Sequence, residues 1–127
     1  MKIAITVWGN RVSPVFDAAS TLFVADIENR IILNKTYTSF NPAIPSDLLK
    51  LLKKMGVTIL ICGAISTKPA DLIIENDIKL ISFVTGNALK LLDNFARKQT
   101  LEKTFMMPGC SKQYCWRNKS SKLHSSI

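Results

Sequence analysis

The residues of this chain best suited to chemistry are two cysteines near its C-terminus. Cys110 and Cys115 are separated by four residues and follow a chain-breaking Pro-Gly pair. Lys112 and Arg117 lie close to them in the sequence, and positive charge favours the thiolate form that binds metals. Structural zinc sites use a similar C-x2-4-C spacing, but they need a second pair of ligands. The spacing therefore indicates a metal or cluster site that this segment alone does not complete.

The third cysteine, Cys62, follows an apolar run and is expected at the carboxyl end of a central strand. Ligands of open α/β sheets bind outside such strand ends. Iron–sulfur clusters usually take four thiolates, and this chain has three cysteines. We therefore predict a metal site formed by Cys110, Cys115 and Cys62, completed by His124 or by a second subunit. Two alternatives stay open: Cys62 is a small buried hydrophobe, and the paired cysteines have no metal partner.

Catalytic signatures are scarce in this chain. His124 is the only histidine and stands three residues from the end, which argues against a Ser-His-Asp or Cys-His arrangement. The sequence has no phosphate-binding loop and no dinucleotide fingerprint. Its aspartates are scattered, without the carboxylate cluster that a two-metal nuclease needs. We expect that the protein is not an enzyme.

Hydrophobic patterning predicts the elements that must position these residues. Three strands come first and are expected to form an antiparallel meander, and later strands alternate with helices and run parallel. Ser46 is expected to cap the first helix and Gly56 to end it. This predicts an α/β fold with a mixed five-stranded sheet and three helices, in the order β-β-β-α-β-α-β-α. The expected strands are 2–8, 22–27, 31–38, 57–62 and 78–84, and the helices follow residue 46, span 67–76 and open at 85–87.

Length and composition fit one domain with a basic tail. The chain has 127 residues, 47% of them hydrophobic, and a net charge of +8. Residues 98–127 hold six basic residues against Glu102 alone, which gives +5 of the +8. We divide the chain into a domain at 1–108 and a tail at 109–127 that we expect to be flexible. Such a tail suits nucleic acid, acidic protein surfaces or anionic cofactors, or is only a solvated end.

The sequence also indicates where the protein works. No apolar run reaches the roughly 18 residues that a membrane helix needs. The N-terminal run from Met1 to Val7 has the pattern of a first strand rather than of a signal peptide. An odd number of cysteines argues against a secreted disulfide framework. We expect a cytoplasmic protein without membrane contact.

Six short blocks, in this order, resemble the dinitrogenase iron–molybdenum cofactor biosynthesis family of small nitrogen-fixation accessory proteins and their orphan relatives. Together they cover about residues 1–110. The blocks are Met1-Lys2-Ile3-Ala4-Ile5, Arg11-Val12-Ser13-Pro14-Val15-Phe16-Asp17, Gly56-Val57, Ile59-Leu60-Ile61-Cys62-Gly63-Ala64-Ile65-Ser66, Phe83-Val84-Thr85-Gly86-Asn87 and Phe105-Met106-Met107-Pro108-Gly109-Cys110. The resemblance implies a ribonuclease-H-like α/β fold and a non-catalytic carrier or chaperone of iron–sulfur or iron–molybdenum cofactors.

One position departs from the family pattern. Many members have a histidine directly after the proline that corresponds to Pro14, and this chain has Val15 there. Cofactor ligation by that histidine therefore does not transfer to this protein. A cysteine would have to replace it as ligand, or this member binds something else.

The expected ligand site lies in the loops at the strand ends, where glycine amides and two helix N-termini favour an anionic cluster. Trp8 either covers this pocket or, as we favour, packs in the core. The candidate cofactor-binding residues are Trp8, Asn10, Arg11, Ser13, Cys62, Gly63, Ser66, Gly86 and Asn87.

The leading function is a non-catalytic binding or carrier protein for an iron–sulfur or iron–molybdenum cofactor. Its expected partners are metallocluster assembly or acceptor proteins, with a homodimer as one way to pool thiols. The alternative is a protein–protein interaction module that acts through the basic tail without a cofactor. A third candidate, nucleic-acid binding, is disfavoured because no basic face interleaved with aromatic residues is visible in the sequence.

Overall fold

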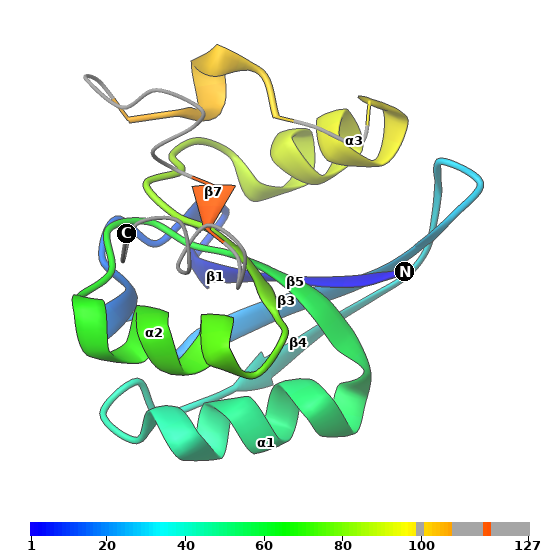
Figure 1. The fold of residues 1–127 in the computed structure, drawn as a ribbon. Coiled ribbons are helices and arrows are strands. Elements are labelled where there is room, and N and C mark those ends of the chain that lie inside the picture. The colour runs from blue at the N-terminus through cyan, green and yellow to red at the C-terminus, as the bar shows by residue number, and fades with distance from the viewer. Residues whose placement is uncertain (99–100, 108–115, 118–127) are drawn as a thin grey trace, which may run out of the picture.

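A computed structural model of the protein describes residues 1–98, 101–107 and 116–117. It shows a mixed α/β fold in which helices pack on both faces of one sheet (Figure 1). The three predicted helices and five predicted strands are all present, and two further strands have two residues each. The strands are β1 (Lys2–Trp8), β2 (Arg11–Val12), β3 (Thr21–Glu28), β4 (Ile31–Ser39), β5 (Val57–Ile61), β6 (Lys79–Ile81) and β7 (Trp116–Arg117). The helices are α1 (Pro45–Met55), α2 (Thr67–Glu75) and α3 (Ala88–Lys98), with short 3-10 turns η1 (Phe16–Ala18) and η2 (Lys103–Phe105).

The sheet has the strand order β4-β3-β1-β5-β6-β7, and β2 pairs with the end of β1. The strands β1, β3 and β4 form an antiparallel meander, while β1, β5 and β6 run parallel. Both parts of this arrangement were predicted from the sequence. The ribonuclease-H-like label stays a prediction, and so does the division at residue 108. Trp116–Arg117, inside the predicted tail, pairs antiparallel with β6.

The hairpin between β3 and β4 follows from its turn residues. Asn29 and Arg30 have φ values of 51° and 64°. Two consecutive residues with positive φ are what a two-residue hairpin turn of type I′ requires. A register shift between Asp26 and Ile27 marks a bulge, which moves one residue of β4 out of the alternation.

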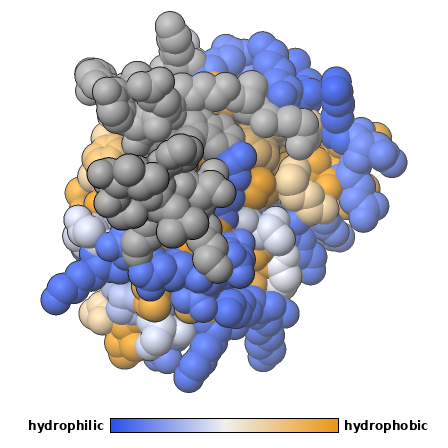
Figure 2. Space-filling view, in the orientation of Figure 1, coloured by the Kyte–Doolittle hydropathy of each residue, from blue (hydrophilic) through white to orange (hydrophobic). Residues whose placement is uncertain are grey.

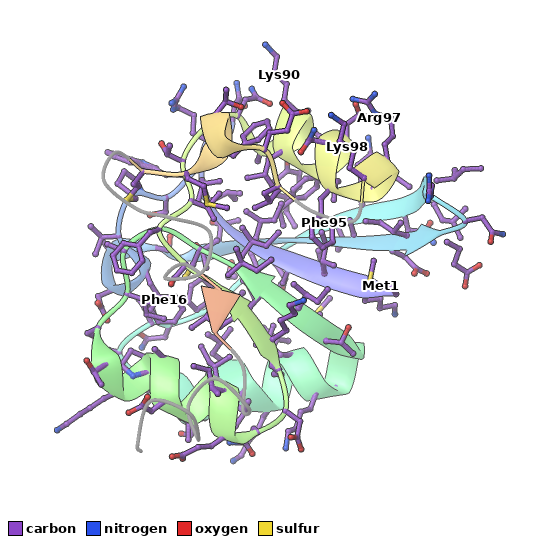
Figure 3. All side chains as sticks on the ribbon, turned by 45° about the horizontal axis from the view of Figure 1, so that its top comes forward. Met1, Phe16, Lys90, Phe95, Arg97 and Lys98 are labelled. Carbon is purple, nitrogen blue, oxygen red and sulfur yellow. The ribbon has the colours of Figure 1, made fainter. Side chains whose placement is uncertain are left out.

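Each face of the sheet buries its own hydrophobic cluster. One cluster joins alternate residues of β1 and β5, such as Ala4 and Leu60, to α1 and α2. The other joins the intervening residues, such as Ile5 and Ile61, to α3. Figure 3 shows Phe95 pointing from α3 to the sheet, while Lys90 and Arg97 point away from it. Burying each large apolar side chain contributes roughly 1.5–3 kcal/mol, so the two faces hold the sheet and helices together.

The ends of α1 differ in how well the sequence predicted them. Ser46 does not cap α1: the helix already begins at Pro45, because proline fits the first helical position, and Ile44 takes the cap without a side-chain hydrogen bond. Gly56 does end the helix, in the left-handed conformation with φ of 75°. The predicted cap was therefore wrong and the predicted stop confirmed.

The coloured surface in one view is largely hydrophilic, and the described helices include no membrane span. Figure 2 shows hydrophilic side chains over much of the coloured surface on this side, with hydrophobic residues in small groups between them. Among the helices within the described ranges, none is long and apolar enough to cross a bilayer.

Candidate functional site

Three loops meet at the carboxyl ends of β1, β5 and β6. We call residues 8–18, 62–67 and 83–87 the loop end. The amide of Phe16 donates to the carbonyl of Ala64 at 2.7 Å, and the Ala64 amide donates to the carbonyl of Pro14 at 2.9 Å. The Val12 amide reaches the carbonyl of Gly86 at 3.0 Å. The structure therefore brings together the same three loops that the sequence singled out.

Gly63 lies in the tightest contact of the loop end. A Cβ atom on this residue would lie 2.3 Å from the carbonyl oxygen of Ser13 and 2.4 Å from that of Pro14. Both neighbours are backbone atoms and cannot turn aside as a side chain could. The glycine is required here so that the first and second loops can touch.

The second and third loops are joined by an exchange of backbone hydrogen bonds. The Cys62 amide donates to the carbonyl of Ile81 at 2.9 Å, and the Val84 amide donates to the carbonyl of Cys62 at 3.0 Å. Phe83, between them, has a positive φ of 61°, which is rare for a bulky residue and marks local strain. These contacts curl the chain out of the sheet, so β5 and β6 end earlier than predicted.

Three of the nine candidate ligand residues are buried. Ser13 is 3% exposed and its hydroxyl donates to the carbonyl of Val15 at 3.0 Å. Cys62 is fully buried in the cluster under α1 and α2, and Gly63 is buried as well. These three residues hold the loops in place. Their contact with a ligand stays a prediction, and for the thiol of Cys62 it requires a change that exposes this buried side chain.

The other candidates reach the surface. Asn10, Arg11 and Ser66 are exposed, and Gly86 and Asn87 are half-buried. Arg11 forms an isolated bridge with Asn87, so the β1–β2 hairpin lies against the start of α3.

Trp8 is 74% exposed, which makes the preferred interpretation of core packing wrong. Its position fits this exposure, because Trp8 is the last residue of β1 and the buried part of the strand ends before it. The indole lines a small open pocket of about 170 Å³. The other lining residues are Ser13, Pro14, Val15 and Ala18.

Two helices point their N-termini at the loop end, but only one leaves its amides open. At α3, the Ala88 amide donates to the carbonyl of Asn10 at 2.8 Å and the Lys90 amide to Asn87 Oδ1 at 3.0 Å. At α2, the N-cap residue Ser66 makes no capping hydrogen bond, and the first turn carries no acidic side chain. Pro69 in the first turn of α2 has no N–H, so the amides left without a capping partner there are those of Thr67 and Lys68, whereas the start of α3 is largely satisfied.

One carboxylate lies beside the open start of α2. The hydroxyl of Ser66 donates to Asp17 Oδ1 at 3.3 Å, which links η1 to the helix. Asp17 is exposed, so its negative charge stands where an anionic ligand would be attracted. Arg11 and Lys68, both exposed, supply positive charge on either side of the same loops.

A segment after α3 closes the third loop from outside. The Thr85 amide donates to the carbonyl of Phe105 at 2.7 Å, and the Met107 amide donates to the carbonyl of Phe83 at 2.9 Å. A Cβ on Gly86, whose φ is 122°, would lie 3.1 Å from the ring of Phe105. Met106 in this segment is 9% exposed and belongs to the hydrophobic cluster under α3.

Glu102 fixes the start of this segment on α3. Its carboxylate accepts hydrogen bonds from Lys98 Nζ at 2.6 Å and from Asn94 Nδ2 at 2.7 Å. The hydrogen bond from Lys98 lowers the pKa of Glu102 most, followed by that from Asn94 and by the positive charge of Lys98.

The predicted metal ligands are not brought together within the described structure. Residues 1–98, 101–107 and 116–117 contain no group of three or more histidine, cysteine or acidic side chains that could hold a metal ion. Cys110, Cys115 and His124 lie outside the described residues. Metal ligation by Cys110, Cys115 and Cys62 therefore stays a prediction.

Sequence reasoning missed two features of the loop end. Pro14, Val15 and Ala18 line the pocket beside Trp8, although the motif that contains them was noted only as part of a family block. Asp17 counted only among the scattered aspartates, and its contact with Ser66 spans 49 positions of the sequence. The one available signal was the pair of motifs themselves, since both stand directly after strands that end at the same edge.

A comparison with protein families decides what this fold belongs to. Residues 1–98 match the family model described as dinitrogenase iron-molybdenum cofactor. The chain belongs to this family. The matched range includes every residue of the loop end. The match also confirms the resemblance that the short sequence blocks suggested, and it fits a cofactor-associated role.

Solved structures with the same fold are similar over most of their length. The crystal structure of PH0822 gives a TM-score of 0.70 at 21% identity, covering 80% of this chain and 95% of that one. A candidate dinitrogenase of Methanocaldococcus jannaschii gives 0.63 at 17% identity, covering 81% and 95%. A candidate NifB protein of Thermotoga, assigned to the DUF35 family, gives 0.61 at 20% identity, covering 86% and 98%. At these identities the likeness shows the fold alone. No curated protein sequence matches the chain.

Proposed function

We propose that the protein is a non-catalytic carrier that binds an anionic iron–sulfur or iron–molybdenum type cluster as cargo at its loop end. Family membership supports a cofactor-associated role. The observation that carries the proposal is the hydrogen-bonded assembly of three loops, the second of which leads into the uncapped start of α2. Helix starts with free amides attract negative charge, and metal–sulfur clusters with thiolate ligands are anionic.

The loop end is suited to holding cargo rather than to transforming it. Its exposed residues include an indole, a guanidinium and a hydroxyl, from Trp8, Arg11 and Ser66. None of these is a general base at neutral pH, and the one carboxylate nearby, Asp17, has no second acid beside it among the contacts of the described residues. Arg11 donates hydrogen bonds and charge, and Trp8 offers an apolar wall next to the pocket.

The proposal also includes two thiols, which belong to residues that the structure does not describe. Cys110 follows Met107 by three positions, and the Met107 amide is bonded to the third loop. We propose that Cys110 and Cys115 supply thiolates to the cargo, with the loop end supplying charge and shape. Assembly and acceptor proteins are the partners that this function needs, and the cytoplasm is its expected location.

Anaerobic reconstitution with ferrous iron and sulfide tests the proposal. We expect the desalted protein to retain iron and to show the visible charge-transfer absorbance of an iron–sulfur cluster. Cys110→Ala together with Cys115→Ala should reduce the retained iron severalfold. A wild-type protein that retains no iron above that of a protein of similar charge and no cysteine contradicts the carrier function.

Charge variants at the loop end separate cargo binding there from binding by the tail alone. Arg11→Gln should weaken retention of the cluster, because it removes a positive charge beside the site. Asp17→Asn should strengthen retention, because it removes a negative charge from the open start of α2. Lys54→Gln, on the outer face of α1, is the matched control and should change nothing. Equal retention in all of these variants would show that the loop end does not bind the cluster.

A further inference from the structure

The strand β4 lies at an open edge of the sheet. Its inner side pairs with β3 over eight positions, and among the described residues no strand pairs with its outer side (Figure 1). Open edges of natural proteins are usually short, interrupted by proline or rich in charge, because they serve as templates for further pairing. β4 has nine residues, no proline and one charged residue, Lys35. The bulge opposite Asp26 and Ile27 affects only the first part of β4, so residues 34–39 have no bulge, no proline and a single charge to oppose further pairing.

The hydrogen bonds of β4 show which backbone groups face outward. The Phe40 amide donates to the carbonyl of Ser20 at 3.0 Å, so the backbone of Phe40 faces β3. Consecutive residues of an antiparallel strand turn their backbone groups to opposite sides. The amides and carbonyls of Lys35, Tyr37 and Ser39 therefore face the open edge, where a second strand would find them.

We propose that two copies of this chain pair antiparallel through β4, with Thr36 opposite the partner's Thr36. This register places Lys35 opposite the partner's Tyr37, and Tyr37 opposite the partner's Lys35. All four residues carry outward-facing backbone groups, so both pairs are hydrogen-bonded pairs of the new ladder. The register is symmetric, as a two-fold dimer requires.

Lys35 disfavours one of the competing symmetric registers. A register in which it lies opposite its own copy places two ammonium groups side by side, which is destabilising. In the proposed register each ammonium lies against a tyrosine ring, an attractive contact between a cation and an aromatic face. The charge of Lys35 disfavours pairing with an arbitrary strand, but in the proposed register it makes a favourable contact with the second copy.

The side chains on this part of the sheet fit the same arrangement. The ring of Tyr37 stacks on Phe23 with 4.8 Å between centroids and 18° between planes, which holds it along the sheet surface. Tyr37 is still 60% exposed and Leu33 is 52% exposed. One face of the Tyr37 ring is thus held by Phe23, while the rest of the ring is accessible to the partner copy.

The proposed dimer keeps the two loop ends apart. β3 runs antiparallel to β1 and β4 antiparallel to β3, so β4 runs in the direction of β1. Antiparallel pairing of two β4 strands therefore puts the loop ends at opposite ends of the joined sheet. The inference does not depend on the proposed carrier function, since each copy keeps its own loop end.

Sedimentation velocity and cysteine cross-linking test the pairing, both in the Cys110→Ser, Cys115→Ser background. With rising protein concentration we expect the mass to change from the 14.2 kDa of one chain to twice that value. Thr36→Cys should form a disulfide dimer on mild oxidation, because the two thiols meet at the two-fold axis. Thr38→Cys is the matched control on the same strand face. Its two thiols lie about 14 Å apart along the strands, so it should not cross-link.

A blocking variant completes the test. Lys35→Pro removes an outward-facing amide that β3 does not use, and proline is tolerated on edge strands. We expect it to be monomeric at concentrations where the parent is dimeric, with an unchanged far-ultraviolet circular dichroism spectrum. A parent protein that stays monomeric at all concentrations overturns the proposal. Equal cross-linking of Thr36→Cys and Thr38→Cys overturns it as well.

Discussion

The loop end and the open edge of β4 differ in what they expose: mainly side chains at the loop end, and backbone groups at the edge. At the loop end the backbone is used within the protein: amides of Val12, Phe16 and Ala64 are bonded to neighbouring loops. What remains outside is mainly a set of side chains, above all Trp8 and Arg11, together with the uncapped start of α2. At the open edge the backbone groups of alternate residues point outward and the side chains are mostly small or aliphatic. A surface of side chains recognises charge and shape, whereas a surface of backbone recognises another strand.

Aromatic residues in the two regions should differ most in their contribution to stability. Phe16 is fully buried at the loop end and packs 5.8 Å from the ring of Phe40. Phe16→Ala should lower the free energy of unfolding by about 3–5 kcal/mol, because a large buried ring leaves a cavity. Tyr37→Ala at the open edge should cost only about 1 kcal/mol. Urea denaturation monitored by circular dichroism measures both, and similar losses for the two variants would contradict the contrast.

The tight contact at Gly63 sharpens the same comparison within the loop end. Gly63→Ala should lower the free energy of unfolding by about 3 kcal/mol, because its Cβ would meet two backbone oxygens. Gly9→Ala is the control: its φ is 64° but nothing lies within 4 Å of the added atom. Its cost should be about 1 kcal/mol, from backbone strain alone. Equal urea midpoints for the two variants would show that the loops can separate freely.

A change at Thr6 should stabilise the protein. Its hydroxyl is fully buried and is the one buried side-chain oxygen or nitrogen in the described residues that lacks a hydrogen-bond partner. Thr6→Val keeps the shape and removes the unpaired group, which should raise the free energy of unfolding by about 1 kcal/mol. Thermal unfolding checks the sign. A lower melting temperature would show that the hydroxyl has a partner in solution.

The smallest expected effect concerns pH. Glu102 has a pKa below the ordinary 4.5 in the folded protein. Because the folded value lies below the unfolded one, the carboxylate stabilises the fold above the unfolded pKa, and this contribution is lost as the pH falls through the folded pKa. Glu102→Gln should therefore reduce the acid sensitivity of the urea midpoint below pH 4.5 and change little else. If the urea midpoint of the variant depends on acid as that of the parent does, Glu102 is not the cause of the acid sensitivity.

The sequence predicted the elements well where one physical cause was sufficient. Unbroken apolar runs gave the buried strands, and Gly56 gave the end of α1, since only glycine adopts that backbone conformation without cost. The prediction of the N-cap of α1 was wrong because two adjacent residues, Pro45 and Ser46, both suit a helix start. Pro45 took the first helical position and displaced Ser46 into the helix.

The loop end shows why a site is harder to predict than a fold. The three loops could be placed at one edge, because parallel strands put their carboxyl ends together. The exposure of Trp8 could not be foreseen, since it depends on which helix covers the end of β1. The neighbourhood of Asp17 and Ser66 depends on packing between η1 and α2, which no local pattern records.

The central position of β1 has a consequence for how the chain folds. β1 pairs antiparallel with β3 close by in the sequence, but parallel with β5 only after α1 has formed between them. Closing the shorter loops costs less chain entropy, so the meander of β1, β3 and β4 should form before β5 docks. Until then one whole side of β1 stays unpaired. A ribosome that has released only the first half of the chain would therefore expose a half-built sheet whose completion depends on residues still to be synthesised.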